Sequence, residues 1–432
     1  MLRSVDQIVR QGKLGKIREN PEIKTIRRDV MGGILTHKKG PLSGLKVLEL
    51  AQYAAGPFAG LLLADLGADV VKIERPGGGD LLRGWSPLLE NADGEAFSAS
   101  FAALNRNKRS FSLDFGDADS RETLYALVRS ADVFLENFRP GVLKKYGLGY
   151  EDLKRINPKL VYCSVTGYGQ TGPYAKRGAF DVTIQAASGL MSVTGEDGGG
   201  PVKAGVPVAD FAAALYAGFS ILAAVRQADQ TGVGAHVDCP MLGCSLGISA
   251  LQTSEFFATG HSPEKLGSRH PKNSPYQAFF GADKAFVVAA GNDKLWQAVC
   301  DSVGRPELVD DPRFLTVPDR ARNQLDLGDL LQPIFSTKPA ATWLQDLNAR
   351  GVPCAPVNTV EDCLADEQTL HMGLVSDMML PNGVTTKTVP FPVAISGFEA
   401  FVGDVPKLGE HSQKILEEWV GRNDKIDHGE AS

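Results

Sequence analysis

Residues 44–80 read GLKVLELAQYAAGPFAGLLLADLGADVVKIERPGGGD, and this stretch decides the fold class. The apolar run 45–50 predicts a strand, residues 58–66 a helix that Gly67 ends, and residues 69–74 a second buried strand. The crossover between the two strands places them parallel. The turn lacks the G-x-G-x-x-G pattern of dinucleotide-binding folds, so we expect a nucleotide-type fold that binds something other than NAD there.

Further strand and helix units follow the first one. The predicted strands are 110–114, 133–136 and 160–165, and the predicted helices are 121–130, 143–156 and the Ala-rich segment 209–228. This alternation predicts an α/β fold, with a parallel sheet covered by helices on both faces. Ligands of such sheets bind at the carboxyl ends of the strands, so the loops of interest begin at Glu74, Asp114, Glu136 and Thr166.

The bulk properties restrict the function classes. A chain of 432 residues exceeds the roughly 250–300 residues that one core supports, which predicts two domains. The net charge of −6 argues against general nucleic-acid binding, and the absence of a long uncharged apolar run predicts no membrane span. None of the six cysteines forms a C-x-x-C motif, which argues against a zinc or redox site and suits a reducing compartment, the cytoplasm.

The N-terminal region, residues 1–40, differs in composition from the rest of the chain. It carries ten Lys and Arg against four Asp and Glu, without a long apolar core. We expect a surface helix or arm rather than a secretory signal. A mitochondrial transit peptide is the alternative, which would place a eukaryotic protein in the matrix, but the acidic residues and the low serine content argue against it.

The loops at the predicted strand ends carry basic and aromatic residues. They read RPGGGD (75–80), NRNKR (105–109), ENFRPG (136–141) and TGYGQTGP (166–173). Arg and Lys at strand ends suit phosphates, and exposed aromatic side chains suit an adenine ring. Each loop alone is also typical of a solvated turn, but four of them at one sheet edge indicate a phosphate-bearing ligand.

In this order the chain carries LSGLKVLEL, AGPFAG, LGADVVKIERPGGGD, NRNKRS, LENFRPGVL, GLGYEDL, SVTGYGQTGPY and GSRHPKNSPYQAF. Together these strings resemble the class III CoA-transferase (CaiB/BaiF-type) family, over residues 41–420. The family includes formyl-CoA transferases, succinyl-CoA:dicarboxylate CoA-transferases and α-methylacyl-CoA racemases. The resemblance implies a Rossmann-like large domain built from N- and C-terminal segments, a smaller α+β domain, and an interlaced homodimer.

The resemblance also implies boundaries and substrates. We expect an arm (1–40), the first part of the large domain (41–235), a helical linker (236–261), the small domain (262–370) and a C-terminal segment returning to the large domain (371–432). The implied substrates are an acyl-CoA and a small carboxylic acid. No permanently bound cofactor and no metal are implied.

Family positions that contact CoA fall on seven residues: Ala54, Arg75, Asn137, Phe138, Lys145, Gly167 and Tyr168. Lys145 stands where the transferases often carry Arg, and Lys lacks the planar fork that binds a phosphate with two hydrogen bonds. Ala54 stands where the oxalate-type enzyme carries Gln, which argues against oxalate and formate as substrates.

By resemblance, an aspartate acts as nucleophile in the acidic loop 194–201, TGEDGGGP, and we predict Asp197. A carboxylate suits the reaction because one carboxylate replaces another on sulfur, through an aspartyl anhydride and an aspartyl-CoA thioester. The same string is a good surface turn, and Glu196 is the alternative register. Asp181 is expected to hold local structure, and Asp210 is explained as a residue at a helix N-terminus.

The loop Gly267, Ser268, Arg269, His270 lies where the family has a loop near the active site. Arg269 or His270 is suited to pair with the second carboxylate of a dicarboxylic acceptor. The loop is closer to the succinyl-CoA-dependent enzymes, which points to acids such as succinate, glutarate, malate or mesaconate. A merely solvated His270 is the alternative.

Other activities stay open as alternatives. A racemase needs two opposed acid/base groups. By resemblance one of them falls on Asp210, which is present, but Phe180 stands in place of the His that this branch carries before Asp181. A thioesterase could use Ser245 in GCSLG (243–247), but Pro240 makes the preceding segment a poor strand, so a packed helical serine is expected. A non-catalytic acyl-CoA-binding protein is the third alternative, against which the intact Asp197 argues.

Overall fold

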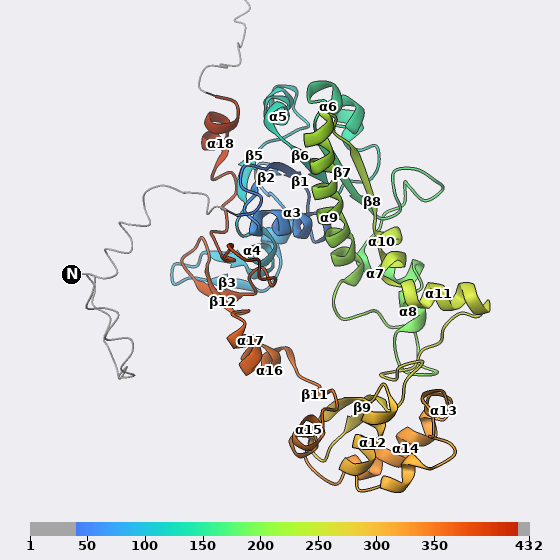
Figure 1. Ribbon diagram of the computed structural model, residues 1–432. Coiled ribbons are helices and arrows are strands. Elements are labelled where there is room, and N and C mark those ends of the chain that lie inside the picture. The colour runs from blue at the N-terminus through green and yellow to red at the C-terminus, as the bar shows by residue number, and fades with distance from the viewer. Residues whose placement is uncertain (1–39, 422–432) are drawn as a thin grey trace, which may run out of the picture. The chain divides into compact units, whose positions relative to one another are not determined.

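The computed structural model describes residues 40–421. Residues 1–39 of the predicted N-terminal arm and the last residues of the predicted C-terminal segment lie outside this range. Figure 1 shows a sheet with helices on both faces, to which the last described helix returns from the C-terminal part of the chain. The predicted α/β fold is confirmed.

The main sheet has six strands, all parallel, in the order β5-β2-β1-β6-β7-β8. Their bounds are β1 Lys46–Leu50, β2 Asp69–Glu74, β5 Arg109–Ser112, β6 Val133–Glu136, β7 Val161–Thr166 and β8 His236–Pro240. The central strands are buried along nearly their whole length, as apolar runs between two helical layers should be.

The strand order reverses between β1 and β6. From β1 the chain moves outward to β2 and β5, and it then returns to the other side of β1 as β6. The crossovers therefore leave on opposite faces, and a crevice opens at the carboxyl ends of these two strands. The turn after Leu50 and the loop after Glu136 form the two sides of this crevice.

The two faces of the sheet have separate cores. One face packs against α3 (Ala55–Asp65), α7 (Asp181–Ala187), α9 (Val208–Thr231) and α10 (Met241–Ile248). The other face packs against α5 (Ala118–Ser130), α6 (Tyr150–Ile156) and the C-terminal α18 (Ser412–Trp419). Because Ile415 and Trp419 are buried in this second core, the large domain draws on both ends of the chain.

Helix α9 is the one described helix that is long and apolar enough to cross a membrane by length and composition. It lies along the sheet in Figure 1, and its alanines pack against β7, β8 and α3. The core helix of a folded domain passes the same test, and burial against the sheet explains the apolar sequence of α9.

Several element boundaries differ from the predictions. Helix α3 begins at Ala55, before the predicted residue 58. The predicted helix 143–156 is broken into η2 (Leu143–Tyr146) and α6, because Gly147 adopts a left-handed conformation with φ 71°. The predicted linker 236–261 begins with strand β8, so the prediction was wrong for its first residues; Pro240 is tolerated because it ends an edge strand.

A smaller α+β part has its own antiparallel sheet and its own core. Its strands are β9 (Tyr276–Phe280), β10 (Ala285–Ala289) and β11 (Cys354–Pro356), in the order β11-β10-β9. Its helices include α12 (Asp293–Ser302), α13 (Val317–Arg322), α14 (Gln324–Phe335) and α15 (Ala340–Ala349). Phe279, Phe335 and Trp296 lie at the centre of this core.

The remaining elements are short. They are η1 (Leu81–Gly84), β3 (Leu88–Glu90), β4 (Ala96–Ser98), α4 (Ala99–Asn105), α8 (Leu190–Val193), α11 (Ala250–Thr259), η3 (Pro306–Val309), α16 (Val360–Ala365), α17 (Glu367–His371), β12 (Ser376–Met379) and β13 (Thr385–Thr388).

Candidate active site

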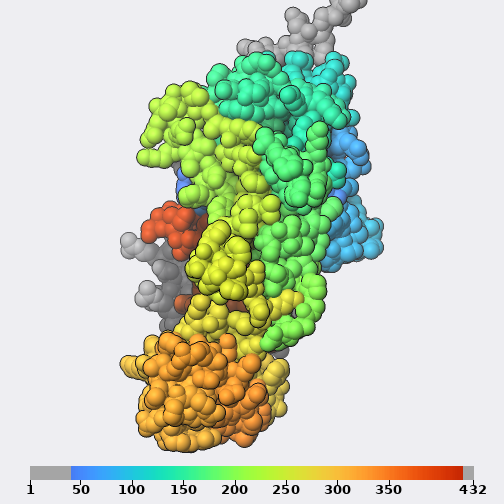
Figure 2. All heavy atoms as spheres, turned by 90° about the vertical axis from the view of Figure 1, so that its right-hand side faces the viewer, coloured from blue at the N-terminus to red at the C-terminus, as the bar shows by residue number. Residues whose placement is uncertain are grey.

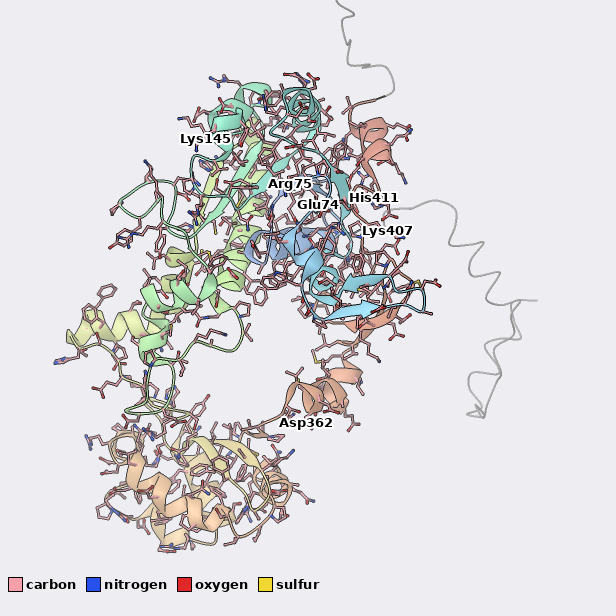
Figure 3. All side chains as sticks on the ribbon, turned by 180° about the vertical axis from the view of Figure 1, so that it is seen from behind. Glu74, Arg75, Lys145, Asp362, Lys407 and His411 are labelled. Atoms are coloured by element: carbon pink, nitrogen blue, oxygen red, sulfur yellow. The ribbon has the colours of Figure 1, made fainter. Side chains whose placement is uncertain are left out.

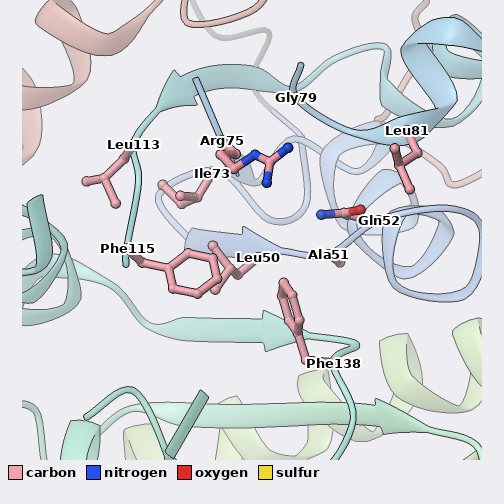
Figure 4. A pocket seen from close by; sticks show the side chains of 10 residues that line it. All are labelled: Leu50, Ala51, Gln52, Ile73, Arg75, Gly79, Leu81, Leu113, Phe115 and Phe138. Carbon is pink, nitrogen blue, oxygen red and sulfur yellow. The ribbon is translucent and has the colours of Figure 1, made fainter. Parts of the chain in front are cut away.

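A first cavity of about 260 Å³ lies at the carboxyl ends of the strands. Figure 4 shows its lining: Leu50, Ala51, Gln52, Ile73, Arg75, Gly79, Leu81, Leu113, Phe115 and Phe138. Phe115 and Phe138 meet edge to face at 5.8 Å, and Arg75 is exposed without an ion pair among the described residues. Aromatic faces beside a free guanidinium suit a ring system that carries phosphate.

A second cavity of about 490 Å³ adjoins the first, and Phe138 lines both. The second cavity is lined by Tyr53 and Ala54 after β1, Asn137 after β6, Gly167 after β7, and the first turns of α7 and α9. Arg75 lines the first cavity and the start of α9 lines the second. A Cβ added at Gly167 would lie 2.3 Å from the Ala179 Cβ, so the close approach of this loop requires glycine.

Asp210, in the first turn of α9, is the carboxylate of this cavity that has no partner. No hydrogen bond or ion pair reaches its side chain from the residues that the structure describes. Burial, and secondarily the charge of Asp181, raises the pKa of Asp210 to about 7. A desolvated carboxylate without hydrogen bonds is more reactive than a solvated one once it is ionised.

The second carboxylate of the cavity, Asp181, is engaged in local structure. Its Oδ1 accepts a hydrogen bond from the Ala209 N–H at 2.9 Å, and its Oδ2 accepts one from Gln185 Nε2 at 2.6 Å. Asp181 thus ties the start of α7 to the start of α9. The two neighbouring carboxylates therefore have different surroundings, which is the arrangement that separates their roles.

Cations line the same cavity without acidic partners. They are Arg139, Arg177 and Lys203, and none of the three forms an ion pair within residues 40–421. The Arg177 guanidinium lies 3.5 Å from the centre of the Tyr174 ring, and Lys203 Nζ donates only to the Ala204 and Gly205 carbonyls. A cavity with three cations that lack acidic partners is suited to a ligand with several negative charges.

Asp197 lines neither cavity. Its side chain is 65% exposed, and its Oδ2 lies 3.5 Å from Arg269 Nη2. Lys265 Nζ donates to the Gly199 carbonyl at 2.9 Å, and the Gly267 N–H donates to the Gly195 carbonyl at 3.0 Å. The segment 265–269 thus holds the acidic loop through these contacts. Glu196 lies against Gly267, because a Cβ added at Gly267 would be 2.6 Å from the Glu196 Oε2.

Some of the CoA-contacting residues predicted from the sequence line the two cavities, and others do not. Arg75 and Phe138 line the first cavity, and Ala54, Asn137, Phe138 and Gly167 line the second. Lys145 is exposed in η2 and Tyr168 packs edge to face against Tyr174, and neither lines these two cavities. Figure 3 shows Lys145 apart from Arg75, on the side of the molecule near α6.

The predicted acceptor loop lines a third cavity, of about 860 Å³, together with α11. Gly267, Arg269 and His270 are among its lining residues, and Asp210 is not. The His270 ring stacks on Tyr276 at 4.8 Å, and its Nδ1 accepts a hydrogen bond from the Lys272 N–H at 3.0 Å. Both contacts of His270 are with residues of its own segment, so they stabilise the conformation of the loop 267–276.

Ser245 is not placed as an accessible nucleophile. It is fully buried within α10, and its hydroxyl has no hydrogen-bond partner among the described residues. A strand, β8, does precede α10, contrary to the prediction, but a nucleophile elbow requires an exposed serine at the turn itself. The helical packing predicted for Ser245 is what the structure has.

Several residues of the second cavity were not predicted from the sequence as site residues, among them Tyr53, Arg177, Lys203 and Asp210. The sequence carries a signal for Asp210, because it is an acid in the first turn of an Ala-rich apolar helix. In the structure its side chain is half-buried. Tyr53 had none, because nothing in its sequence surroundings predicts its left-handed backbone, with φ 63°.

The sequence profile described as CoA-transferase family III matches residues 42–412. A protein of Agrobacterium fabrum named succinate–glutarate CoA-transferase is 40% identical over 391 residues, which cover 89% of this chain and 97% of that one. The human protein named succinyl-CoA:glutarate CoA-transferase is 38% identical over 89% of this chain and 87% of its own. The crystal structure of a CAIB/BAIF family protein from Brucella suis matches with a TM-score of 0.79 and 41% identity, over 88% of this chain and 100% of that one.

Proposed function

The chain belongs to CoA-transferase family III and moves CoA between an acyl-CoA and a carboxylic acid, and we propose that it does so with Asp210 as the nucleophile. The proposed donor is succinyl-CoA or another dicarboxylyl-CoA. The observation that carries the proposal is the position of Asp210, a carboxylate without partners in a cavity that shares Phe138 with the Arg75 cavity.

The chemistry follows from a carboxylate beside a thioester. The Asp210 carboxylate attacks the thioester carbonyl, the carbon–sulfur bond breaks, and a mixed anhydride and CoA thiolate result. The thiolate attacks the aspartyl carbonyl of the anhydride, which releases the donor acid and leaves an aspartyl-CoA thioester. The acceptor carboxylate attacks this thioester, and the released thiolate then attacks the acceptor carbonyl of the new anhydride, which gives the new acyl-CoA and free Asp210.

Asp210 is preferred to Asp197 because of its surroundings. A nucleophile for a CoA thioester must lie in the ligand cavity and must be short of hydrogen bonds when it attacks. Asp210 satisfies both conditions, whereas Asp197 is exposed and paired with Arg269. Asp197 remains the competing candidate, and the experiments separate the two.

The turn before α3 is suited to stabilise the oxyanion that forms during attack. Ala54 and Ala55 line the cavity, and α3 begins there without a side-chain cap. The N–H groups of a first helical turn are free donors, and donors aimed at a developing negative charge are worth several kcal/mol.

For CoA we propose a path from the first cavity to the second. The base and phosphates would lie near Phe115, Phe138 and Arg75, and the thioester would lie near Asp210. Phe138 is the residue common to both cavities. Lys145 and Tyr168 would then contact only the outer parts of the ligand.

For the acceptor we propose a dicarboxylic acid. The names of the Agrobacterium and human relatives include succinate or succinyl-CoA together with glutarate, and the cations Arg177 and Lys203 share the Asp210 cavity. One carboxylate of the acceptor would react at Asp210 while a cation of the cavity binds the other. Arg269 and His270, the cationic candidates from the sequence, would serve this purpose only if their loop moved toward Asp210.

We also propose a homodimer. Apolar side chains on α9 and α11 are exposed, among them Phe219 at 76%, Leu251 at 77% and Phe257 at 82%. Figure 2 looks onto α11, whose yellow-green residues face the viewer. An apolar surface of this kind supports a second copy as its cover, and light scattering after size-exclusion chromatography measures the assembly.

The test is an assay with succinyl-CoA and a panel of acids, run with the wild type and the Asp210→Ala and Asp197→Ala variants. The proposal predicts formation of acceptor-CoA that is lost in Asp210→Ala and kept in Asp197→Ala. The opposite pattern would restore Asp197. Free CoA release without transfer, lost with Ser245→Ala, would indicate a thioesterase. Deuterium exchange at the α-carbon of a 2-methylacyl-CoA would indicate a racemase.

A further inference from the structure

We propose that Asp80 and Lys72, which line neither the Arg75 cavity nor the Asp210 cavity, are positioning residues that hold the active-site turn 51–57 in its reactive conformation. They belong to a buried network of four charges that includes Glu49 and Lys108. The proposal rests on the proposed function, because the turn matters only if it faces the reacting carbonyl.

The backbone of the turn is strained at Tyr53, so other groups must hold its conformation. Tyr53 has φ 63°, a conformation that L-residues other than glycine adopt rarely and at a cost of about 1–3 kcal/mol. Tyr53 and Ala54 both line the Asp210 cavity. Since strained residues persist only where their surroundings fix them, the contacts of this turn identify the groups that fix it.

Three of the four charged side chains bond the backbone of the turn. Lys72 Nζ donates to the Ala51 carbonyl at 2.7 Å. The Tyr53 N–H donates to Asp80 Oδ1 at 3.3 Å. Lys108 Nζ donates to the Pro57 carbonyl at 2.8 Å. The turn is therefore held at its start, at its strained residue and at the first turn of α3.

The charges also hold one another. Lys72 Nζ lies 2.9 Å from both Asp80 Oδ2 and Glu49 Oε1, and Lys108 Nζ lies 2.7 Å from Glu49 Oε2. All four side chains are fully buried. A Cβ at Gly60 of α3 would lie 1.8 Å from Glu49 Oε2, so the helix leaves space for the network at that point.

Stability alone does not account for this network. Removing charges from water is costly, and well-packed apolar side chains often replace a buried ion pair with no loss of stability. The network instead supplies directed hydrogen bonds to the peptide groups of one turn. A misplacement of about 1 Å at a reacting centre can lower a rate about 100-fold, so fixing this turn has a functional use.

The test compares Asp80→Asn with Asp65→Asn. Asp80→Asn keeps the volume and an acceptor oxygen but loses the charge that fixes it to Lys72. Asp65 is a matched control, because it is also buried, pairs with Arg106 at 2.7 Å, and lies at the other end of α3. We expect kcat to fall about 10- to 100-fold in Asp80→Asn with KM for acyl-CoA changed less than about threefold, and kcat to change less than about twofold in Asp65→Asn.

A second measurement does not depend on activity. Hydrogen exchange, followed by mass spectrometry of peptides that contain residues 51–57, should be faster in Asp80→Ala than in the wild type and unchanged in Asp65→Ala. If Asp80→Asn does not fold, the neutral double variant Lys72→Met, Asp80→Asn takes its place, because it leaves Glu49 paired with Lys108. The same fall in kcat is expected of it.

Equal loss of kcat in the Asp80 and Asp65 variants, or unchanged exchange in the turn, would overturn the positioning role. These outcomes are distinct from failure of the proposed function. If the wild type transferred no CoA, the function would fail while the exchange experiment still reported on the turn. If the wild type transferred CoA and Asp80→Asn matched it, the function would stand and the positioning role would fall.

Discussion

Asn137 bonds both peptide groups of Gln52. The Gln52 N–H donates to Asn137 Oδ1 at 3.0 Å, and Asn137 Nδ2 donates to the Gln52 carbonyl at 2.7 Å. The bonds join the ends of β1 and β6 across the point where the strand order reverses. The side-chain amide that the sequence assigns to CoA is thus engaged with the backbone, and a ligand meets the turn that Asn137 holds.

Asn137→Ala is predicted to cost about 1–3 kcal/mol of unfolding free energy, because two partly buried peptide groups lose their partner. It is also predicted to lower kcat at least tenfold, because the turn is freed. Urea denaturation and steady-state kinetics measure the two effects. Asn157→Ala is the control, since Asn157 also bonds two backbone carbonyls of the large domain, those of Val128 and Ala131, and should lower stability without lowering kcat.

The pH dependence of the rate should follow Asp210. Because only the ionised carboxylate attacks, and its pKa is raised to about 7, kcat/KM for acyl-CoA should rise with pH through about pH 7. Asp181→Asn removes the neighbouring negative charge that contributes to this shift, so the rising limb should move to lower pH. A limb that stays in place in Asp181→Asn would contradict the contribution of the Asp181 charge and leave burial as the cause of the raised pKa.

The raised pKa of Asp210 also predicts how the free energy of unfolding changes with pH. Between the unfolded pKa of 3.8 and about 7, the native state holds a proton at Asp210 that the unfolded state has lost, so this group lowers stability as pH rises through that range. Asp210→Asn should therefore be more stable than the wild type at pH 8, by at most about 4 kcal/mol, and equal to it near pH 4. Thermal denaturation at the two pH values checks this, and a variant less stable at pH 8 would contradict it.

Arg75 and Lys145 should differ in their effect on substrate binding. Arg75 lines the first cavity with its charge unpaired, so Arg75→Ala should raise KM for acyl-CoA about tenfold with little change in kcat. Lys145 lines neither ligand cavity, so Lys145→Ala should change KM less than about threefold. Equal effects would show that the phosphates lie elsewhere than in the cavity of Figure 4.

The sheet was predictable because its strands are short apolar runs between turn residues. Val47, Val70 and Val133 stand side by side in register, and each lies in a run that the sequence marks as buried. Strand β8 was missed because Pro240 argued against it. Pro240 is the last residue of an edge strand, which has a neighbour on one side only, and such a position tolerates proline. Gly147 broke a predicted helix through its left-handed backbone, which periodicity does not reveal.

The site was only partly predictable, because burial and distant contacts define it. Asp197 and Asp210 are both acids near turn residues, and the sequence does not say which of them faces a cavity. The distinction depends on Arg269, which pairs with Asp197, and on Asp181, whose bonds place the start of α9. Similarly, Asp80 and Lys72 acquire their roles only when β2 brings them beneath the turn after β1.

Trapping the covalent intermediate tests the central claim most directly. The wild type is incubated with succinyl-CoA and then with hydroxylamine, which converts an aspartyl-CoA thioester to a hydroxamate and releases CoA. Tandem mass spectrometry of the digested protein locates the modified carboxyl group. The account predicts a hydroxamate on Asp210 that requires succinyl-CoA, and a hydroxamate on Asp197 or Glu196 instead would contradict it.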